Sequence, residues 1–348
     1  MSYISEVRPS DKRGMRQIET LLAQEGLRLD AHLDYTCALF DETYQVIATG
    51  SCFKDSLRCF AVDRAHQGEG LLNQIVSHLI EYQCSQGNMH LFLYTKADSA
   101  KFFQDLGFTE IERVPGHLVF MENRPQGFAE YLRRLQKESG VRQSSSTKRI
   151  GAVVMNANPF TYGHLYLVEK AAAACDLLHL FIVSEDASIV PFPVRKRLVM
   201  EGTAHLHNLI YHDSGSYIIS TVTFPGYFLR DEADVVFRQA ELDIRVFNHI
   251  AAALDISVRF VGEEPNSLVT ALYNEAMKEY GQIEQIVIPR KQALGKAISA
   301  STVRCLLRDS DWHSLSALVP PTTLKYFQSP EAAGLLKKMQ CAGDLVHY

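Results

Sequence analysis

From residue 149 onward, short apolar runs alternate with helical patterns, and this alternation restricts the possible folds more than any other feature. The first run, 149–155, is apolar enough for a strand that is buried on both faces of a sheet. Strands that alternate with helices form parallel sheets with helices packed on both faces. We therefore predict an α/β domain with a parallel sheet. Its expected strands are 149–155, 177–183, 208–212, 217–220, 256–261 and 283–288, and its expected helices are 163–174, 193–200, 231–253 and 268–280.

The region before residue 136 has a different pattern, and a polar segment separates it from the rest. Met15, Ile18, Leu21 and Leu22 recur at helical spacing, which predicts a helix over 14–27. The segment 136–148, QKESGVRQSSSTK, has the composition of a linker. A chain of 348 residues is long enough for two domains, so we predict a mixed α/β domain over 1–135 and a second domain over 149–348. The other elements expected in the first domain are strands 35–40, 44–53, 57–62 and 90–95 and helices 71–84 and 99–106.

The overall composition argues against several classes of function. A net charge of -5 is unlike that of a general nucleic-acid binder, which presents a basic face. The N-terminal segment is charged, and no run approaches the ~20 apolar residues that cross a bilayer. These features predict a cytoplasmic protein with neither a nucleic-acid nor a membrane partner. The seven cysteines contain no C-x-x-C pair, so we predict no metal site.

The segment IGAVVMNANPFTYGHLYLVEKAA carries the strongest functional signal. The expected strand ends at Asn156, a short loop turns the chain, and a helix begins near Gly163. Ligands of parallel sheets bind at the carboxyl ends of the strands, and the N–H groups at a helix start attract anions. Thr161 and His164 therefore stand where phosphates would dock, and Gly163 would let a phosphate or base come close. The alternative for His164 is an ordinary capping bond.

A second motif, ISASTVR, has the same kind of signal. Ser299 or Ser301 can cap a helix that follows, and Arg304 then lies near the start of that helix. A guanidinium can bind two phosphate oxygens at once. Just upstream, Arg290 and Lys291 form a local basic cluster, for which the alternative is a solvated loop.

Together, the two motifs resemble the H/T-x-G-H and I-S-x-S/T-x-x-R signatures of the nucleotidyltransferase superfamily. In that superfamily, the first loop and its histidine bind the triphosphate and stabilise charge on the phosphorus under attack. The resemblance implies a Rossmann-like nucleotidyltransferase domain over 149–348. The catalytic residues that it implies are Thr161, His164 and Arg304. The ATP- and phosphate-binding residues that it implies are Asn156, Asn158, Pro159, Phe160, Gly163, Arg290, Lys291, Ser299, Ser301 and Thr302.

Two further loops leave alternatives open. The loop VPFPVRKR supplies Arg195, Lys196 and Arg197, which either reach the substrate or pyrophosphate or face solvent. The segment GEEPNS, 262–267, follows an expected strand. It either lines the nucleotide pocket or forms a simple turn with a helix cap.

The N-terminal region contains its own glycine-rich loop, HQGEG, between an expected strand and an expected helix. Gln67, Gly68 and Gly70 resemble the Q/R-x-x-G-x-G/A loop of GNAT-type N-acetyltransferases, whose backbone amides hold the pyrophosphate of coenzyme A. The later KFFQDLGF resembles that family's closing helix, although Leu72 stands where the loop has Gly or Ala. The resemblance implies a GNAT-like domain that binds a CoA-like arm, and the alternative is an ordinary turn. No acid or base for acetyl transfer is evident in the sequence.

A GNAT-like domain followed by this nucleotidyltransferase-like domain resembles, over nearly the whole chain, the citrate (pro-3S)-lyase ligase family. The resemblance implies an acid–thiol ligase that uses ATP with Mg²⁺ to activate acetate as acetyl-adenylate. The acetyl group then passes to the thiol of a CoA-derived prosthetic group on the acyl-carrier (gamma) subunit of citrate lyase, and AMP and pyrophosphate are released. Two alternatives stay open. One is a nucleotidyltransferase that acts on a phosphate acceptor, like pantetheine-phosphate adenylyltransferase, and the other is a non-catalytic CoA or nucleotide sensor.

Overall fold

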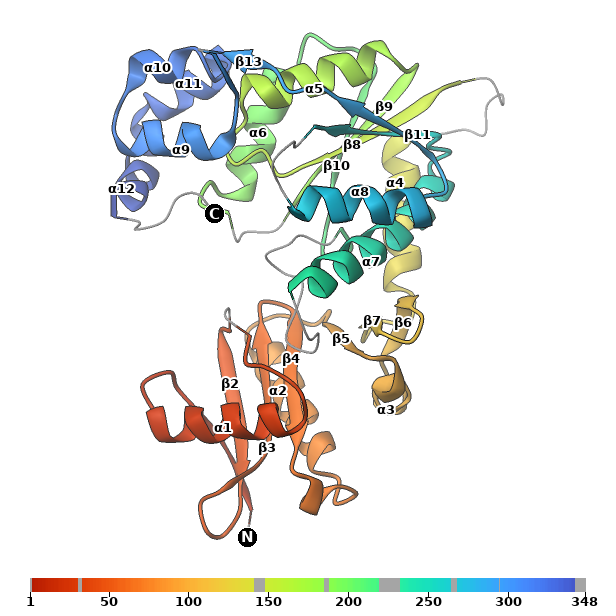
Figure 1. Ribbon diagram of the computed structural model, residues 1–348, viewed down its shortest axis with the longest axis vertical. Coiled ribbons are helices and arrows are strands. Elements are labelled where there is room, and N and C mark those ends of the chain that lie inside the picture. Colours follow the sequence, from red (N-terminus) through yellow and green to blue (C-terminus); the bar gives the residue numbers. More distant parts are fainter. Residues whose placement is uncertain are drawn as a thin grey trace. The chain divides into compact units, whose positions relative to one another are not determined.

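The computed structural model divides into two compact units (Figure 1). Unit 1 comprises Met1–Ala129 and Phe224–Leu242, and unit 2 comprises Glu130–Thr223 and Asp243–Tyr348. Within the part of the chain that the structure describes, no helix is both long enough and apolar enough to cross a membrane. The described residues are 2–30, 33–140, 148–184, 188–218, 232–263, 268–293 and 295–341.

Unit 1 is built on a mixed seven-stranded sheet in the order β1-β2-β3-β4-β5-β7-β6. Strands β4 and β5 run parallel, and their pairing covers only Ser56 with Phe92 and Leu57 with Leu93. The strands separate beyond these pairs, which leaves space for a ligand between their carboxyl ends. The strands are β1 (Tyr3–Glu6), β2 (Tyr35–Phe40), β3 (Val46–Phe53), β4 (Ser56–Val62), β5 (Phe92–Lys96), β6 (Thr109–Val114) and β7 (Leu118–Glu122).

The helices of unit 1 pack on this sheet through their apolar faces. Ile18, Leu21 and Leu22 are buried, so the predicted helical spacing is confirmed. Asp11 caps the same helix by accepting the Gly14 N–H at 3.0 Å, as N-cap carboxylates commonly do. The helices are α1 (Lys12–Gln24), α2 (Leu71–Ser85) and α3 (Ala100–Asp105).

Unit 2 contains the predicted parallel sheet, with five strands in the order β10-β9-β8-β11-β12. The chain moves outward from β8 first in one direction and then in the other, so the strand order reverses between β8 and β11. Because crossovers between parallel strands are right-handed, α5 and α8 lie on opposite faces of the sheet (Figure 1). The strands are β8 (Ile150–Met155), β9 (Leu177–Ile182), β10 (Leu209–Asp213), β11 (Val258–Gly262) and β12 (Glu284–Ile288). The helices are α5 (Tyr162–Ala173), α6 (Phe192–Gly202), α8 (Leu268–Tyr280) and the part of α7 (Glu232–Ala253) that follows Leu242.

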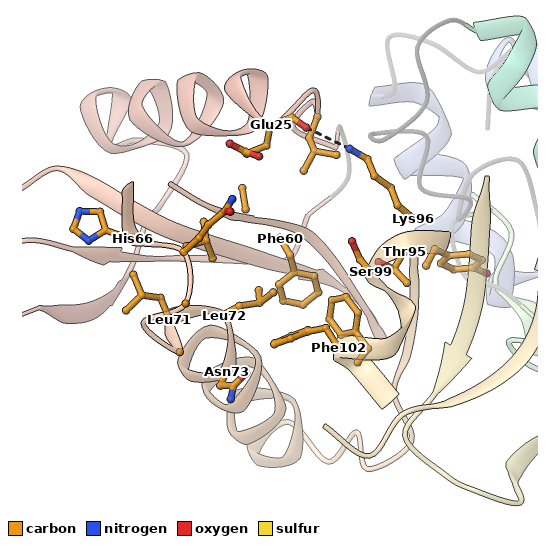
Figure 2. Close-up of a pocket in the computed structure, with 18 residues that line it drawn as sticks. Glu25, Phe60, His66, Leu71, Leu72, Asn73, Thr95, Lys96, Ser99 and Phe102 are labelled. Carbon is orange, nitrogen blue, oxygen red and sulfur yellow. Dashed lines mark hydrogen bonds between the residues drawn. The ribbon is translucent and has the colours of Figure 1, made fainter. Parts of the chain in front are cut away.

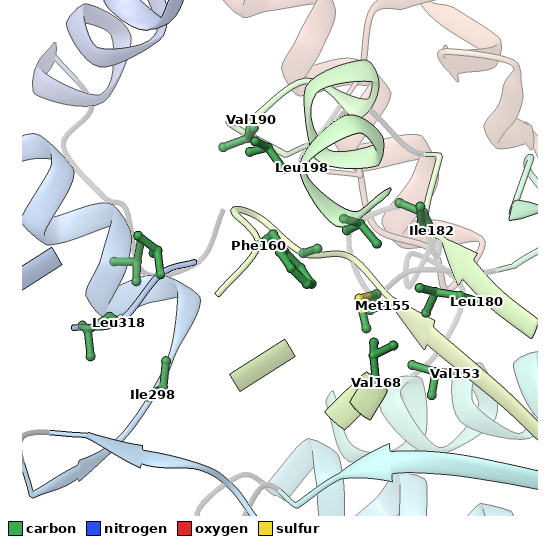
Figure 3. Packing of buried hydrophobic residues seen from close by; sticks show 14 of the residues in the cluster. Val153, Met155, Phe160, Val168, Leu180, Ile182, Val190, Leu198, Ile298 and Leu318 are labelled. Atoms are coloured by element: carbon green, nitrogen blue, oxygen red, sulfur yellow. The ribbon is translucent and has the colours of Figure 1, made fainter. Parts of the chain in front are cut away.

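A C-terminal group of helices completes unit 2 and shares its core. Ile298 and Leu318 from this group are buried with Phe160 and with residues of β8 and α6. Figure 3 shows Phe160 within this cluster, near Met155 of β8 and Leu198 of α6. The cluster therefore joins the loop after β8 to the C-terminal helices. The elements are the hairpin β13 (Gln292–Ala293) and β14 (Lys296–Ala297), followed by α9 (Ala300–Arg308), α10 (Trp312–Ser316), α11 (Pro321–Phe327) and α12 (Ala333–Cys341).

Several elements differ from the sequence-based predictions. Strands β1, β6 and β7 and helix α4 (Gly127–Ser139) were not predicted, and the last turn of α4 occupies residues 136–139 of the expected linker. Residues 141–147 of that linker lie outside the described residues. The expected strand 217–220 is wrong for its first two residues, which form a turn and a bend, and residues 219–220 lie outside the described part.

Candidate active site

A cavity of about 520 Å³ opens at the carboxyl ends of β8, β11 and β12. It lies beside the reversal of strand order, where α/β sheets bind their ligands, and its volume is typical of small-molecule sites. The first turns of α5 and α9 contribute to its wall. The predicted site residues that line this one cavity are Asn156, Thr161, Gly163, His164, Arg290, Lys291, Ser299, Ser301 and Arg304.

Thr161 and His164 form a reciprocal cap at the start of α5. Thr161 Oγ1 accepts the His164 backbone N–H at 3.3 Å, and His164 Nδ1 accepts the Thr161 backbone N–H at 3.1 Å. Since a backbone N–H can only donate, Nδ1 must be unprotonated, and the proton of the neutral ring lies on Nε2. The side chain of His164 therefore caps its helix and also offers an N–H donor at Nε2.

The imidazole of His164 is neutral at pH 7. Burial lowers the pKa of His164 to about 4, and the positive charge of Arg290 contributes to this shift. The ring lies at 15° to that of Phe160, with 6.0 Å between the centroids, which restricts its orientation. An anion at Nε2 would raise this pKa, because it favours the protonated ring.

At Gly163 the start of α5 lies close to the segment before α9. An added Cβ would lie 3.4 Å from Thr161 Oγ1 and 3.5 Å from the carbonyl oxygen of Ile298, which are ordinary contact distances. A methyl group would fit here, so the packing of the protein does not by itself require glycine. Because Gly163 lines the cavity, a larger side chain would take up ligand space.

The N-terminus of α9 forms the opposite wall with a group of hydroxyls. Ser299 is the N-cap and accepts the Thr302 N–H at 3.1 Å, and its Oγ lies 3.0 Å from that of Ser301. Arg304 is only 3% exposed and donates from Nη1 to the carbonyl oxygen of Asn158 at 2.7 Å. Arg304 thus links α9 to the loop that follows β8.

The loop after β12 adds positive charge to the cavity. The Lys291 ammonium lies 5.1 Å from the ring centroid of Tyr162 and 5.9 Å from that of Tyr166, within the range of cation–π attraction. Arg290 donates from Nε to the carbonyl oxygen of Glu263 at 2.7 Å. These contacts hold both cations at the cavity wall, as a site for an anionic ligand requires.

Four predicted site residues lie beside the cavity rather than on its wall: Asn158, Pro159, Phe160 and Thr302. Asn158 Oδ1 accepts the Val190 N–H at 3.1 Å, which anchors the loop. Phe160 is fully buried. Thr302 donates its N–H to the α9 cap. Their observed contacts shape the loop and the helix that carry the lining residues.

The three basic residues of the segment VPFPVRKR lie in α6, and their side chains contact different partners. Arg195 is fully buried and donates to the carbonyl oxygens of Val183 and Val190. Lys196 pairs with Asp213 at 2.7 Å, and Arg197 pairs with Glu331 at 2.9 Å. The described lining of the cavity includes none of the three.

Sequence reasoning missed part of the cavity wall. Tyr166 lines the cavity one helical turn after Tyr162, and this aromatic pair at helical spacing was visible in the sequence. The segment GEEPNS contributes Gly262 and Glu263 to the wall, while residues 264–267 lie outside the described part. These two residues thus lie on the wall of the cavity that the other predicted site residues line, and the nucleotide-binding role of the segment stays a prediction.

Unit 1 has a separate cavity of about 510 Å³ where β4 and β5 diverge (Figure 2). Gln67, Gly68 and Gly70 line it together with the first turn of α2. Gly68 has φ +86° and Gly70 has φ +73°, a conformation that glycine adopts without strain. Among the described residues, no side chain caps α2 at Gly70, so N–H groups of its first turn can receive an anion.

The rest of the unit 1 cavity is mainly apolar. Phe60, Leu72 and Phe102 lie on its wall in Figure 2. The dashed line there marks the bond from Lys96 Nζ to the carbonyl oxygen of Glu25, at 3.3 Å. An anion-binding end joined to an apolar channel would fit a long ligand with a charged head.

The fold and the two cavities define a two-unit α/β protein with a candidate phosphate site in its parallel-sheet unit. Residues 150–327 match the family model of the citrate lyase ligase C-terminal domain. Over 330 residues the chain is 38% identical to the citrate (pro-3S)-lyase ligase of Haemophilus influenzae. The aligned region covers 92% of this chain and 96% of that protein. The chain therefore belongs to the citrate lyase ligase family, whose members are enzymes.

Two solved structures resemble parts of this chain. The superposition on a GNAT-family acetyltransferase from Staphylococcus aureus covers 36% of this chain and 100% of the acetyltransferase, with 14% identity and a TM-score of 0.30. The superposition on Thermotoga maritima TmcAL, solved with alpha-thio ATP, covers 54% of this chain and 57% of TmcAL, with 13% identity and a TM-score of 0.37.

Proposed function

We propose that this chain activates acetate with ATP and transfers the acetyl group to the thiol of the citrate lyase acyl carrier. An acetate oxygen attacks the α-phosphorus of ATP, the bond to the β-phosphate breaks, and acetyl-adenylate and pyrophosphate form. The carrier thiol then loses its proton to solvent and attacks the acetyl carbonyl, which releases AMP. Acetate and ATP are thereby converted into a thioester, AMP and pyrophosphate.

The observation that supports this proposal best is the convergence of two distant motifs on one cavity. Thr161 and His164 from the start of α5 face the same 520 Å³ space as Ser299, Ser301 and Arg304 from α9. A donor-rich crevice at the carboxyl ends of parallel strands suits a triphosphate. Family membership supports the choice of ligation over the other reactions that this site could perform.

Each of these side chains has a role in the proposed reaction. His164 donates from Nε2 to a non-bridging oxygen of the α-phosphate, where charge develops during the attack. Lys291 and the N–H groups at the starts of α5 and α9 offset the charge of the departing pyrophosphate. Arg304 keeps the loop and α9 in register through its bond to Asn158. Positioning and charge neutralisation account for most of the catalysis in such transfers.

The proposal includes Mg²⁺, which would enter the site bound to the phosphates of ATP. Glu263 supplies a carboxylate at the cavity wall. One carboxylate with phosphate oxygens and water is a common set of ligands for Mg²⁺. The cytoplasmic location predicted from the sequence is part of this proposal, since ATP is supplied there.

The unit 1 cavity is proposed to bind the CoA-derived arm of the carrier. Gln67, Gly68 and Gly70 would hold its phosphate groups at the start of α2, and the apolar channel would receive the rest of the arm. Titration of the full-length protein with dephospho-CoA tests this idea. The Gly70→Val variant should bind more weakly, because a β-branched residue is strained at φ +73°. Equal affinity of both proteins would contradict the proposal.

An ATP–pyrophosphate exchange assay tests the first half-reaction. The protein is incubated with labelled pyrophosphate, ATP and a panel of short carboxylic acids, with and without the acyl-carrier subunit. Acetate-dependent exchange, and an acetyl product that hydroxylamine traps, are the expected results. A product in which AMP is joined to a phosphate acceptor, without acid-dependent exchange, would instead establish a nucleotidyltransferase.

A further inference from the structure

Arg195 contacts the candidate site through its neighbour Asn156. Its guanidinium is fully buried beneath the end of β8. From Nη1 it donates to the Asn156 carbonyl oxygen at 2.7 Å and to Asn156 Oδ1 at 2.8 Å. The carbonyl oxygen of Val183 lies 2.7 Å from the same nitrogen, so three acceptors share its two hydrogens. The guanidinium therefore holds both the backbone and the side chain of one cavity-lining residue.

These contacts determine which way the Asn156 amide faces. A guanidinium only donates, so the atom 2.8 Å from Nη1 must be the amide oxygen. Ser188 Oγ lies 3.0 Å from Nδ2 and 3.1 Å from Oδ1, so its hydroxyl can accept from the nitrogen or donate to the oxygen. Ser188 therefore uses at most one of the two Nδ2 hydrogens in the described structure. Asn156 is exposed and lines the cavity, so at least one Nδ2 hydrogen remains for a ligand.

We propose that Arg195 is a positioning residue that orients Asn156 so that its Nδ2 donates to an anionic oxygen of the bound reactants. This inference rests on the proposed function, because the anion is a phosphate or carboxylate of the activation step. It assigns Arg195 an indirect role, since its charge lies beneath the strand end and does not reach the ligand. Asn156 becomes the substrate-contacting member of the pair.

Substitution of Asn156 separates this role from a purely structural one. In Asn156→Asp, one carboxylate oxygen pairs with Arg195, and the other replaces the donor with an acceptor that faces an anion. The thermal midpoint should stay equal to that of the wild type or rise, while kcat/KM for ATP falls roughly 100-fold. Asn156→Ala removes the donor without adding charge, and kcat/KM should fall roughly 10-fold.

A double-mutant cycle tests whether Arg195 acts through Asn156. Arg195→Lys keeps the charge, but a single ammonium cannot reproduce the fork geometry of the guanidinium. We expect this change to lower kcat/KM roughly 10-fold in the wild type and less than about 2-fold in the Asn156→Ala background. The matched control is Arg197→Lys on the same helix, where Arg197 pairs with Glu331 away from the described cavity lining. It should change kcat/KM by less than about 2-fold.

The measurements are acetate-dependent ATP–pyrophosphate exchange and calorimetric titration with ATP, both on the full-length protein. Equal effects of Arg195→Lys in the two backgrounds would overturn the inference, as would an Asn156→Asp protein with at least half of wild-type activity. If the wild type bound ATP but catalysed no exchange, the proposed reaction would be contradicted. The role of Arg195 would then be tested by comparing the ATP affinities of the same variants. If the wild type bound no ATP, both would fall.

Discussion

His164 has two separable functions in this structure, and two substitutions should divide them. Its Nδ1 accepts the Thr161 N–H at 3.1 Å, and its Nε2 carries the proton that faces the ligand in the proposed reaction. Asn places its oxygen near the position of Nδ1, and Gln places its amide nitrogen near that of Nε2. His164→Asn should therefore keep the helix cap and lose the donor, while His164→Gln should keep the donor and lose the cap.

The expected magnitudes follow from these two bonds. Loss of a cap costs about 1 kcal/mol, which lowers the thermal midpoint of a unit of this size by about 2–4 °C. Loss of a donor to developing charge costs about 2.7 kcal/mol of barrier, or roughly 100-fold in turnover. His164→Asn should then be the more stable and the less active of the two variants.

Differential scanning fluorimetry and ATP–pyrophosphate exchange measure the two effects independently. His205→Gln is the matched control, because His205 is an exposed histidine that pairs with Glu169 at 3.1 Å. Its turnover and midpoint should equal those of the wild type. The reasoning is refuted if His164→Asn turns over as fast as His164→Gln, since the donor at Nε2 would then contribute nothing.

Packing, charge and pH allow three further tests. In Gly202→Ala, the new Cβ would lie 2.5 Å from the buried Phe160 ring. Urea denaturation should therefore show a free energy of unfolding that is lower by about 1–3 kcal/mol. An unchanged urea midpoint would contradict this packing. Lys291→Met removes a cation from the cavity wall, so calorimetry should show ATP binding roughly 10-fold weaker; equal affinity would exclude phosphate contact. Stability should fall as the pH drops from 6.5 toward 4, because burial lowers the pKa of His179 to about 3 and that of His164 to about 4. The unfolded chain takes up these protons first, at up to about 1.4 kcal/mol per pH unit for each group, and a flat stability curve between pH 6.5 and 4.5 would contradict this.

Much of the fold was predictable because long periodic segments bury one face. The predicted helix over 268–280 coincides with α8, and the predicted strand over 35–40 coincides with β2. The missed strand β6 reads TEIERV, and its exposed and half-buried residues mask the alternation at the sheet edge. Helix α4 was missed because its last turn continues into a serine-rich segment, although Tyr131 and Leu135 carried a helical spacing.

Local sequence patterns were enough to identify the residues suited to phosphate chemistry and the points where strands meet helices. Thr161, His164 and Arg304 could be singled out because strand–loop–helix segments and N-cap residues leave local patterns. Their convergence on one cavity depends on the strand order, which brings the ends of β8, β11 and β12 together. The inward direction of Arg195 was likewise decided by tertiary structure, because the carbonyl oxygens that it contacts come from strand ends and loops distant in the chain. Local sequence specifies a side chain's chemistry, but long-range packing specifies its neighbours.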